Sequence, residues 1–293
     1  MEKVIKRSHL QGVETSGKWS RLITSFCYAV LSFTAVVMFH QGLLAFLSYK
    51  LGYTTHLSFV KVDSKPYENI YWSTNRVLFL YAFPPGLLLL ITVLLISRMY
   101  LYTSKVIDKW FALSFWWCVC SILYVSSQMT IALVAYSFGR EDMYQGIPVV
   151  INWFGFPLWF TLFLSLISLL INLVMGFFFF QFAMQFSPSR GAVFNYKKQA
   201  ETIRLHYIYP LLILIPVGMV FSFPKTSFFF IVFLINGLIW IPGLIIKGRG
   251  GYANEARMER NEIRNIKPSG VLAVILFLII IRVVLFIMDK YWY

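Results

Sequence analysis

The feature that most constrains this fold is a series of long apolar runs almost free of charge. Two of them, LLLLITVLLI and VILFLIII, lack the alternation of apolar and polar residues that marks a membrane β-strand. Since hydrocarbon offers no hydrogen-bond partner to a bare backbone, such runs are stable in a bilayer as helices. Hydrophobic residues make up 59% of the chain and charged residues 13%, against roughly 45–50% and about 25% in soluble domains. The sequence therefore predicts an all-α fold, a polytopic transmembrane helical bundle.

Seven apolar stretches approach the roughly 20 residues that one membrane crossing requires. Together they predict a single transmembrane domain over residues 1–293, with a cytoplasmic connection at residues 247–270. The predicted spans lie near residues 22–49, 77–97, 110–138, 159–186, 208–221, 227–246 and 271–288.

Two of these stretches are irregular. The apolar run Val149–Phe186 is too long for one upright helix, so we expect an interfacial or re-entrant piece before a span that starts near Trp159. The segment 208–221 is short and contains Pro210 and Pro216, each of which removes a backbone hydrogen bond. We expect it to be tilted, kinked or half-crossing. Six and eight spans therefore stay open as alternatives to seven.

Lysine and arginine are unevenly distributed between the two sides of the predicted bundle. Of the 26, 18 fall on the side of the N-terminus and seven on the other side, and Arg282 lies inside the last span. Basic residues collect on the cytoplasmic side of membrane proteins. We therefore expect a cytoplasmic N-terminus, an external C-terminus and a location in the cytoplasmic (inner) membrane. The net charge of +14 is interpreted as membrane topology, and no nucleic-acid partner is expected.

None of the twelve acidic residues falls within a predicted span. Proton-coupled transporters and intramembrane aspartyl enzymes carry a membrane-embedded carboxylate, because a titratable group at that depth is retained for its function. The sequence also lacks a Walker-type phosphate loop and a GxSxG elbow. We predict no catalytic residue, no metal ligand and no cofactor, and we expect the three cysteines, which all lie in apolar runs, to be packing residues.

Polar and basic side chains suggest contacts between helices and with the membrane. The amides of Asn172, Gln128 and Asn236 are expected to hydrogen-bond across helices. Arg282 is expected to snorkel to the interface or to contact an acidic group. The segment SRGAVFNYKKQAETIRLHY interleaves basic and apolar residues, which suits a layer of anionic headgroups. Its candidate lipid-contact or partner-contact residues are Arg190, Lys197, Lys198 and Arg204.

The longest cytoplasmic connection, residues 247–270, begins with a glycine-rich hinge and continues as a helix-prone stretch of mixed charge. Two interpretations stay open for it. It is either a solvated surface helix or an arm that docks a protein partner.

One segment resembles a known family. His40-Gln41-Gly42-Leu43-Leu44-Ala45 is followed, after FLSYK, by Leu51-Gly52. This spacing resembles the membrane helix of the site-2 proteases, in which HExxH is followed by alanine and, farther on, by a Leu-Gly pair. In that family the two histidines bind zinc and the glutamate is the general base. The alternating THLSFVKVD, after Leu-Gly, fits the strand beside the family motif.

The resemblance implies a catalytically inactive relative. Gln41 stands at the position of the glutamate, and an amide does not accept a proton as a base does. Leu44 stands at the position of the second histidine and has no lone pair for zinc. The family's third ligand, an aspartate in a later span, has no acidic counterpart among the predicted spans. His40 and Gly52 match the pattern, and His40 is expected to be a hydrogen-bonded packing residue.

Three functions follow from these observations. The leading hypothesis is a non-enzymatic subunit, scaffold or stabilising partner of a membrane complex, with a protein partner in the membrane. The alternative is a transporter or channel for a neutral or hydrophobic solute, whose cavity would be lined by discontinuous helices. The third is an intramembrane metalloprotease-like enzyme.

Overall fold

The computed structural model of the chain describes residues 2–57, 62–66, 72–101, 109–138, 146–187, 195–222 and 229–249, with single positions between 273 and 284. Its long helices are α1 (Glu2–Lys50), α2 (Thr74–Leu101), α3 (Lys109–Phe138), α5 (Leu158–Met184) and α9 (Phe229–Arg249). The shorter elements are β1 (Tyr53–Leu57), β2 (Val62–Pro66), α4 (Ile147–Trp153), α7 (Tyr196–Ile203), the π-helix η2 (Arg204–Ile208) and α8 (Tyr209–Ser222).

Five helices are long and apolar enough to cross a membrane. They are Arg21–Lys50, Thr74–Leu101, Trp110–Ser137, Leu158–Met184 and Phe229–Ile246. Each overlaps one of the predicted spans, so the prediction of a helical membrane protein is confirmed. Of the predicted span 271–288 the structure describes only single positions between 273 and 284, and Arg282 and Arg190 lie outside the described residues.

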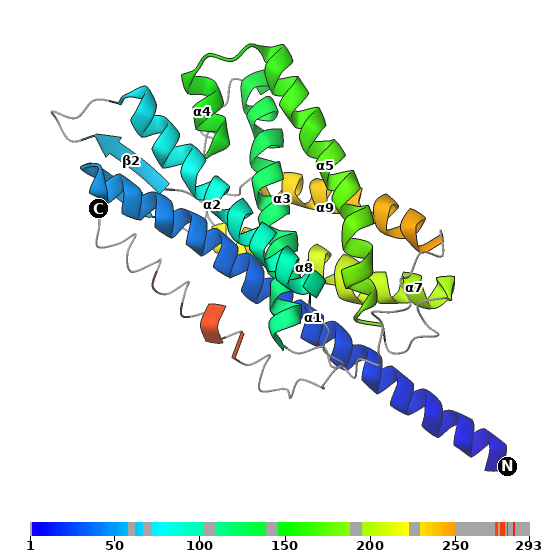
Figure 1. Cartoon of the computed structure of the whole chain (residues 1–293). Helices are drawn as coiled ribbons and strands as arrows, with labels where there is room; N and C mark the ends of the chain where they lie inside the picture. Colours follow the sequence, from blue (N-terminus) through cyan, green and yellow to red (C-terminus); the bar gives the residue numbers. More distant parts are fainter. Residues whose placement is uncertain are drawn as a thin grey trace.

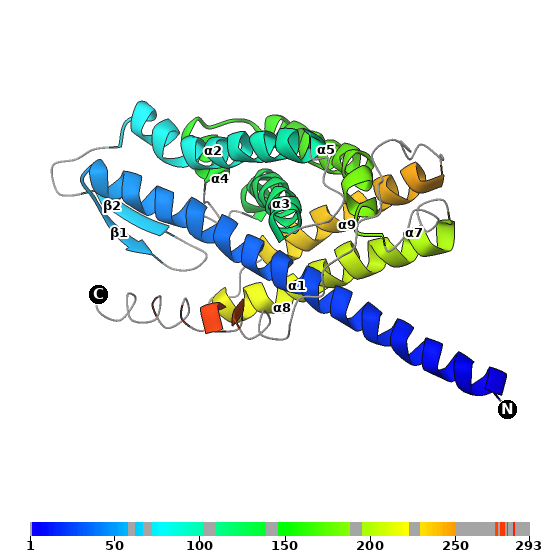
Figure 2. The same ribbon diagram turned by 60° about the horizontal axis from the view of Figure 1, so that its bottom comes forward.

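Helix α3 is the centre of the bundle. It contacts α1, α2, α4, α5 and α9, and Figure 2 shows it end-on with α1, α2 and α5 around it. It is the most buried of the five long apolar helices, whereas α2 and α5 are the least buried and expose many apolar side chains. In a bilayer those exposed faces suit lipid. We therefore search for a candidate functional site in the interior around α3.

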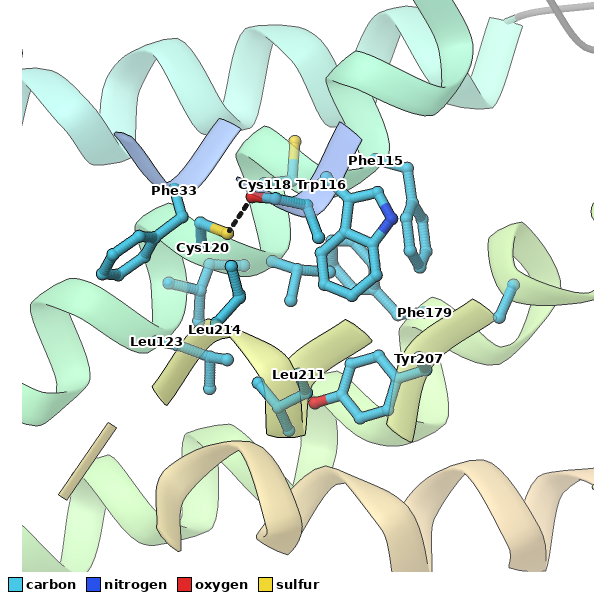
Figure 3. Close-up of a cluster of buried hydrophobic side chains, with 14 of the residues drawn as sticks. Phe33, Phe115, Trp116, Cys118, Cys120, Leu123, Phe179, Tyr207, Leu211 and Leu214 are labelled. Carbon is cyan, nitrogen blue, oxygen red and sulfur yellow. Dashed lines mark hydrogen bonds between the residues drawn. The ribbon is translucent and has the colours of Figure 1, made fainter. Parts of the chain in front are cut away.

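The core beside α3 is aromatic and tightly interlocked (Figure 3). Trp116 stacks on Tyr207 with ring centroids 6.2 Å apart and planes 9° apart, and Tyr207 stacks on Trp240 at 5.9 Å. Cys120 is buried here, with its Sγ 4.0 Å from the carbonyl oxygen of Ala29. Cys27 and Cys118 are buried too, which confirms that the cysteines are packing residues.

Helix α1 is much longer than the span predicted within it. It runs for 49 residues, of which the candidate span takes the last 30. Its N-terminal part projects from the bundle in both ribbon views (Figures 1 and 2). The helix ends at Lys50, and two residues later Gly52 has a φ of 81°, in the left-handed region that glycine adopts without strain.

The prediction of one strand over THLSFVKVD, residues 55–63, is wrong in its extent: residues 55–57 end β1, residues 62–63 begin β2, and residues 58–61 lie outside the described residues. β1 pairs antiparallel with β2 in a register that places Tyr53 opposite Pro66 and Leu57 opposite Val62. The hairpin begins directly at Gly52, so the Leu-Gly pair marks the transition from helix to strand.

The long apolar run Val149–Phe186 is divided between two helices, as predicted. The short helix α4 comes first, and α5 begins at Leu158, next to the expected Trp159. Gly155 separates the two helices with a φ of 61°, a conformation that breaks a helix and suits glycine. α4 contacts α2 and α3.

The fifth predicted span, residues 208–221, is part of a helical segment that is longer than its apolar residues suggested. α7, η2 and α8 follow one another without a break from Tyr196 to Ser222. Pro210 has no N–H and so leaves the carbonyl of His206 without its usual helical partner. The backbone responds with a π-turn, in which the N–H of Tyr209 bonds to the carbonyl of Arg204. The predicted irregularity is thus a π-helix one turn before Pro210.

Candidate functional site: the polar belt of α3

Five polar residues lie close together near the middle of α3, in an otherwise apolar span. We call Tyr124, Ser126, Ser127, Gln128 and Thr130 the α3 polar belt. All are buried except Thr130, which is partly buried. Polar groups in a membrane interior are costly unless they find hydrogen-bond partners. The partners of the belt therefore show what it does.

On one side the belt meets α1 through His40. The Tyr124 hydroxyl lies 3.1 Å from His40 Nδ1, and Gln128 Nε2 lies 3.5 Å from His40 Nε2. Gln128 Oε1 accepts a bond from the backbone N–H of Ile147 at 3.2 Å, so its Nε2 is the atom that faces His40. His40 Nε2 then accepts, and Nδ1–H donates to Tyr124. Gln41 Nε2 donates to the same hydroxyl at 3.2 Å.

This arrangement engages both ring nitrogens of His40. In the tautomer that carries the proton on Nδ1, the chain of donors runs from the first N–H of α4 through Gln128 and His40 to Tyr124. Three helices are joined by it. The expectation that His40 is a hydrogen-bonded packing residue is confirmed.

Leu44 lies one helical turn beyond His40 and has a different environment. It is buried in a second apolar cluster with Tyr53, Val77 and Leu80. The two motif positions that would need zinc-binding atoms therefore hold an imidazole engaged at both nitrogens and a hydrocarbon side chain. Among the described residues, no group of three or more His, Cys, Asp or Glu side chains could hold a metal ion.

On the other side the belt meets α5 and α9 through amides. Asn172 Oδ1 accepts bonds from Trp240 Nε1 at 2.9 Å and from Ser126 Oγ at 3.3 Å. Asn236 Nδ2 donates to Ser127 Oγ at 3.1 Å. With the bonds of Gln128, these confirm that the three predicted amides hydrogen-bond across helices. The belt ties α3 to α1, α4, α5 and α9.

A second polar contact explains how the chain tolerates Pro210. Ser25 Oγ donates to the carbonyl oxygen of His206 at 3.1 Å, the group that the proline leaves unpaired. The same Ser25 Oγ accepts a bond from Trp116 Nε1 at 3.2 Å. One hydroxyl from α1 thus satisfies a tryptophan of α3 and the π-turn together, and it fixes where η2 lies against α1.

Replacing Ser25 with alanine is expected to lower the free energy of unfolding by about 1–2 kcal/mol, because a buried carbonyl and a buried indole N–H lose their partner. Thermal unfolding of the purified protein in detergent measures the effect. Ser97→Ala is the matched control, since Ser97 is exposed and bonds to the carbonyl of Val93 in its own helix. An equal melting temperature for both variants contradicts the assignment.

Sequence reasoning missed several members of this network. Tyr124, Ser126 and Ser127 carried a signal, the cluster YVSSQMT within an apolar span. Ser25 and Trp116 carried none, because a serine and a tryptophan in an apolar helix are individually ordinary. Of the predicted basic contacts, Lys197, Lys198 and Arg204 are exposed and stand apart from the belt.

Comparisons of the chain with protein-family models, with curated proteins and with solved structures found no match. The function is therefore argued from the geometry of this chain.

Proposed function

We propose that this chain is a non-enzymatic integral membrane protein that acts as a subunit, scaffold or stabilising partner of a membrane complex. The observation that carries the proposal is the use made of the interior polar groups. His40, Gln41, Gln128 and Asn172 bond to side chains or backbone of neighbouring helices. Side chains engaged in this way join the helices to one another, which supports a role through the fold.

The membrane arrangement that we propose has seven spans, a cytoplasmic N-terminus and a location in the inner membrane. Its fifth span is η2 with α8, whose 5 and 14 residues follow one another without a break. Nineteen residues at 1.5 Å each reach about 28 Å, close to the roughly 30 Å of a hydrocarbon core. The excess of basic residues on the N-terminal side supports the orientation.

The part of α1 ahead of its span offers a partner a docking element. The 49 residues of the helix exceed the 30 of the span by 19, which corresponds to about 28 Å of helix beyond the membrane. Its sequence, EKVIKRSHLQGVETSGKWS, mixes basic and polar residues with Val4, Ile5 and Leu10. The connection 247–270 is the second such element; its first three residues are the end of α9, and residues 250–270 lie outside the described residues.

Copurification tests the scaffold. The full chain is extracted from its native membrane in mild detergent, and proteins retained in stoichiometric amount are identified. A variant that lacks residues 2–17 serves as the comparison, because it keeps the five apolar helices and loses the projecting arm. We expect a stoichiometric membrane partner with the full chain and less of it with the variant. A monodisperse monomer without partners would overturn the proposal.

We also propose that the resemblance to site-2 proteases reflects a degenerate, inactive relative of that family. Purified protein is expected to contain zinc far below one ion per chain, even after incubation with excess zinc. Elemental analysis measures this, and His40→Ala is the control. One zinc per chain that disappears in His40→Ala would show the metalloprotease-like alternative to be right.

One observation favours the transporter or channel alternative. The polar belt lies inside the bundle, and the same bundle contains a helix with a π-turn before Pro210; irregular helices together with buried polar groups are features of transport sites. Flux of small neutral solutes into liposomes that contain the purified monomer tests it. Flux that Gln128→Leu abolishes would favour transport over the scaffold.

A further inference from the structure

Helix α7 has two distinct faces. Gln199, Thr202 and Ile203 are buried, and α7 contacts α5 and α9. Its first three residues are exposed, and so is Arg204 at the start of η2. We call these four residues, Tyr196, Lys197, Lys198 and Arg204, the basic face of α7. The packing of this short helix against the end of the bundle determines which of its side chains are buried and which are exposed.

The start of α7 is held rigidly. Asn195 is its N-cap, and Asn195 Oδ1 accepts bonds from the backbone N–H groups of Lys197 at 3.0 Å and Lys198 at 3.4 Å. An N-cap of this kind satisfies amides that would otherwise lack helical partners. The two lysines therefore extend from an ordered helical turn and not from a loop.

The contacts of η2 place α7 at the end of the bundle where the candidate span of α1 begins. The bond from Ser25 to the His206 carbonyl lies four residues inside Arg21, where the candidate span of α1 begins. α7 precedes η2 and therefore lies at or outside that boundary. Trp19, which is 65% exposed on α1, and Tyr196, 46% exposed on α7, are aromatic residues of the kind that gather at membrane interfaces.

The charge at this end of the bundle is mostly positive. Among the side chains that the structure describes there, the acidic group is Glu201 and the basic groups are Arg21, Arg98, Lys197, Lys198 and Arg204. Basic groups next to a bilayer attract anionic headgroups, and the attraction decays within a Debye length. A lipid phosphate group next to the basic face would be within that range.

We propose that the basic face of α7 binds the headgroups of anionic phospholipids in the leaflet at this end of the bundle. With the cytoplasmic N-terminus of the proposed topology, this is the cytoplasmic leaflet. Lys197 and Lys198 supply the attraction, Asn195 orders them, and Tyr196 lies at the headgroup level. The proposal goes beyond the scaffold function, because lipid binding requires no protein partner.

Lipid titration of the full chain in neutral detergent tests the proposal. Retained phosphatidylglycerol and phosphatidylcholine are counted by native mass spectrometry at increasing lipid concentration. We expect the protein to bind phosphatidylglycerol more tightly, and the double variant Lys197→Gln, Lys198→Gln to lose about 30-fold in that affinity. Lys197→Arg with Lys198→Arg, which keeps both charges, is expected to retain it. Inorganic phosphate at the same concentration is expected not to displace the lipid.

The matched control is Lys50→Gln, which removes one exposed lysine at the opposite end of α1. It is expected to leave phosphatidylglycerol binding unchanged, whereas Lys198→Gln alone is expected to weaken it about five-fold. Equal binding of the two lipids by the native protein overturns the proposal. Full retention of the preference by the double glutamine variant overturns it as well. Neither result depends on whether a protein partner copurifies.

Discussion

Gly176→Ala is expected to separate α5 from α9 and to lower the free energy of unfolding by about 3 kcal/mol, at the upper end of the cost of overpacking. A Cβ added at Gly176 would lie 2.3 Å from the carbonyl oxygen of Trp240 and 3.0 Å from its Cα. Both are backbone atoms, so no side-chain rotation relieves the clash. Close approach of this kind through small residues is how membrane helices gain packing contacts. Thermal or denaturant unfolding in detergent measures the loss.

The control is Gly86→Ala on α2, where an added Cβ meets nothing within 4 Å. Alanine is favoured over glycine inside a helix by roughly 0.5–1 kcal/mol, so this variant is expected to be as stable as the native protein or more so. Gly243 faces the same crossing from α9, and a Cβ there would lie 2.7 Å from the carbonyl oxygen of Leu173. Since either substitution already separates the helices, Gly176→Ala with Gly243→Ala is expected to cost less than the sum of the two. If the Gly176→Ala variant were as stable as the native protein, that result would contradict the close approach of α5 and α9 at this glycine.

Much of the fold could be predicted because membrane insertion depends on length and hydropathy. The apolar runs gave the five long helices directly, and the 38-residue run Val149–Phe186 was correctly divided into α4 and α5. The fifth stretch was bounded too tightly. Its apolar residues begin at Ile208, but the helix continues upstream through His206 to Tyr196, since a π-turn accommodates Pro210 without ending the helix.

Only part of the candidate site was predicted, because its residues indicate a site only when they are considered together. Asn172, Gln128 and Asn236 could be expected to pair across helices, since a buried amide in lipid requires a partner. Which partner each finds depends on how the helices are rotated about their axes, and apolar runs that are hydrophobic on all sides do not fix this rotation. Two of the partners were therefore not predicted. They are Trp240, whose indole N–H donates to Asn172, and Tyr124, whose hydroxyl bonds to His40 and Gln41.

Asn172→Ala is expected to lower the free energy of unfolding by about 2–3 kcal/mol. It removes the shared acceptor of Trp240 Nε1 and Ser126 Oγ, and a buried donor left without an acceptor costs about 1–3 kcal/mol. An average interhelical hydrogen bond in a membrane contributes about 0.6 kcal/mol. The larger expected value reflects the indole N–H of Trp240, which stays behind unpaired, whereas the Ser126 hydroxyl keeps the carbonyl oxygen of Leu123 at 3.1 Å as an acceptor. Asn152→Ala, at an exposed position of α4, is the matched control.

A double-mutant cycle separates this mechanism from a simple cavity. Trp240→Phe removes the indole N–H, so that in Asn172→Ala with Trp240→Phe this donor is no longer unpaired. If the cost of Asn172→Ala comes from stranded donors, the pair of substitutions costs less than the sum of the single ones by about 1 kcal/mol or more. If the two costs add, the hydrogen bond contributes nothing beyond packing. The polar belt would then be a by-product of the packing, and the argument for a hydrogen-bonded scaffold would lose its energetic basis.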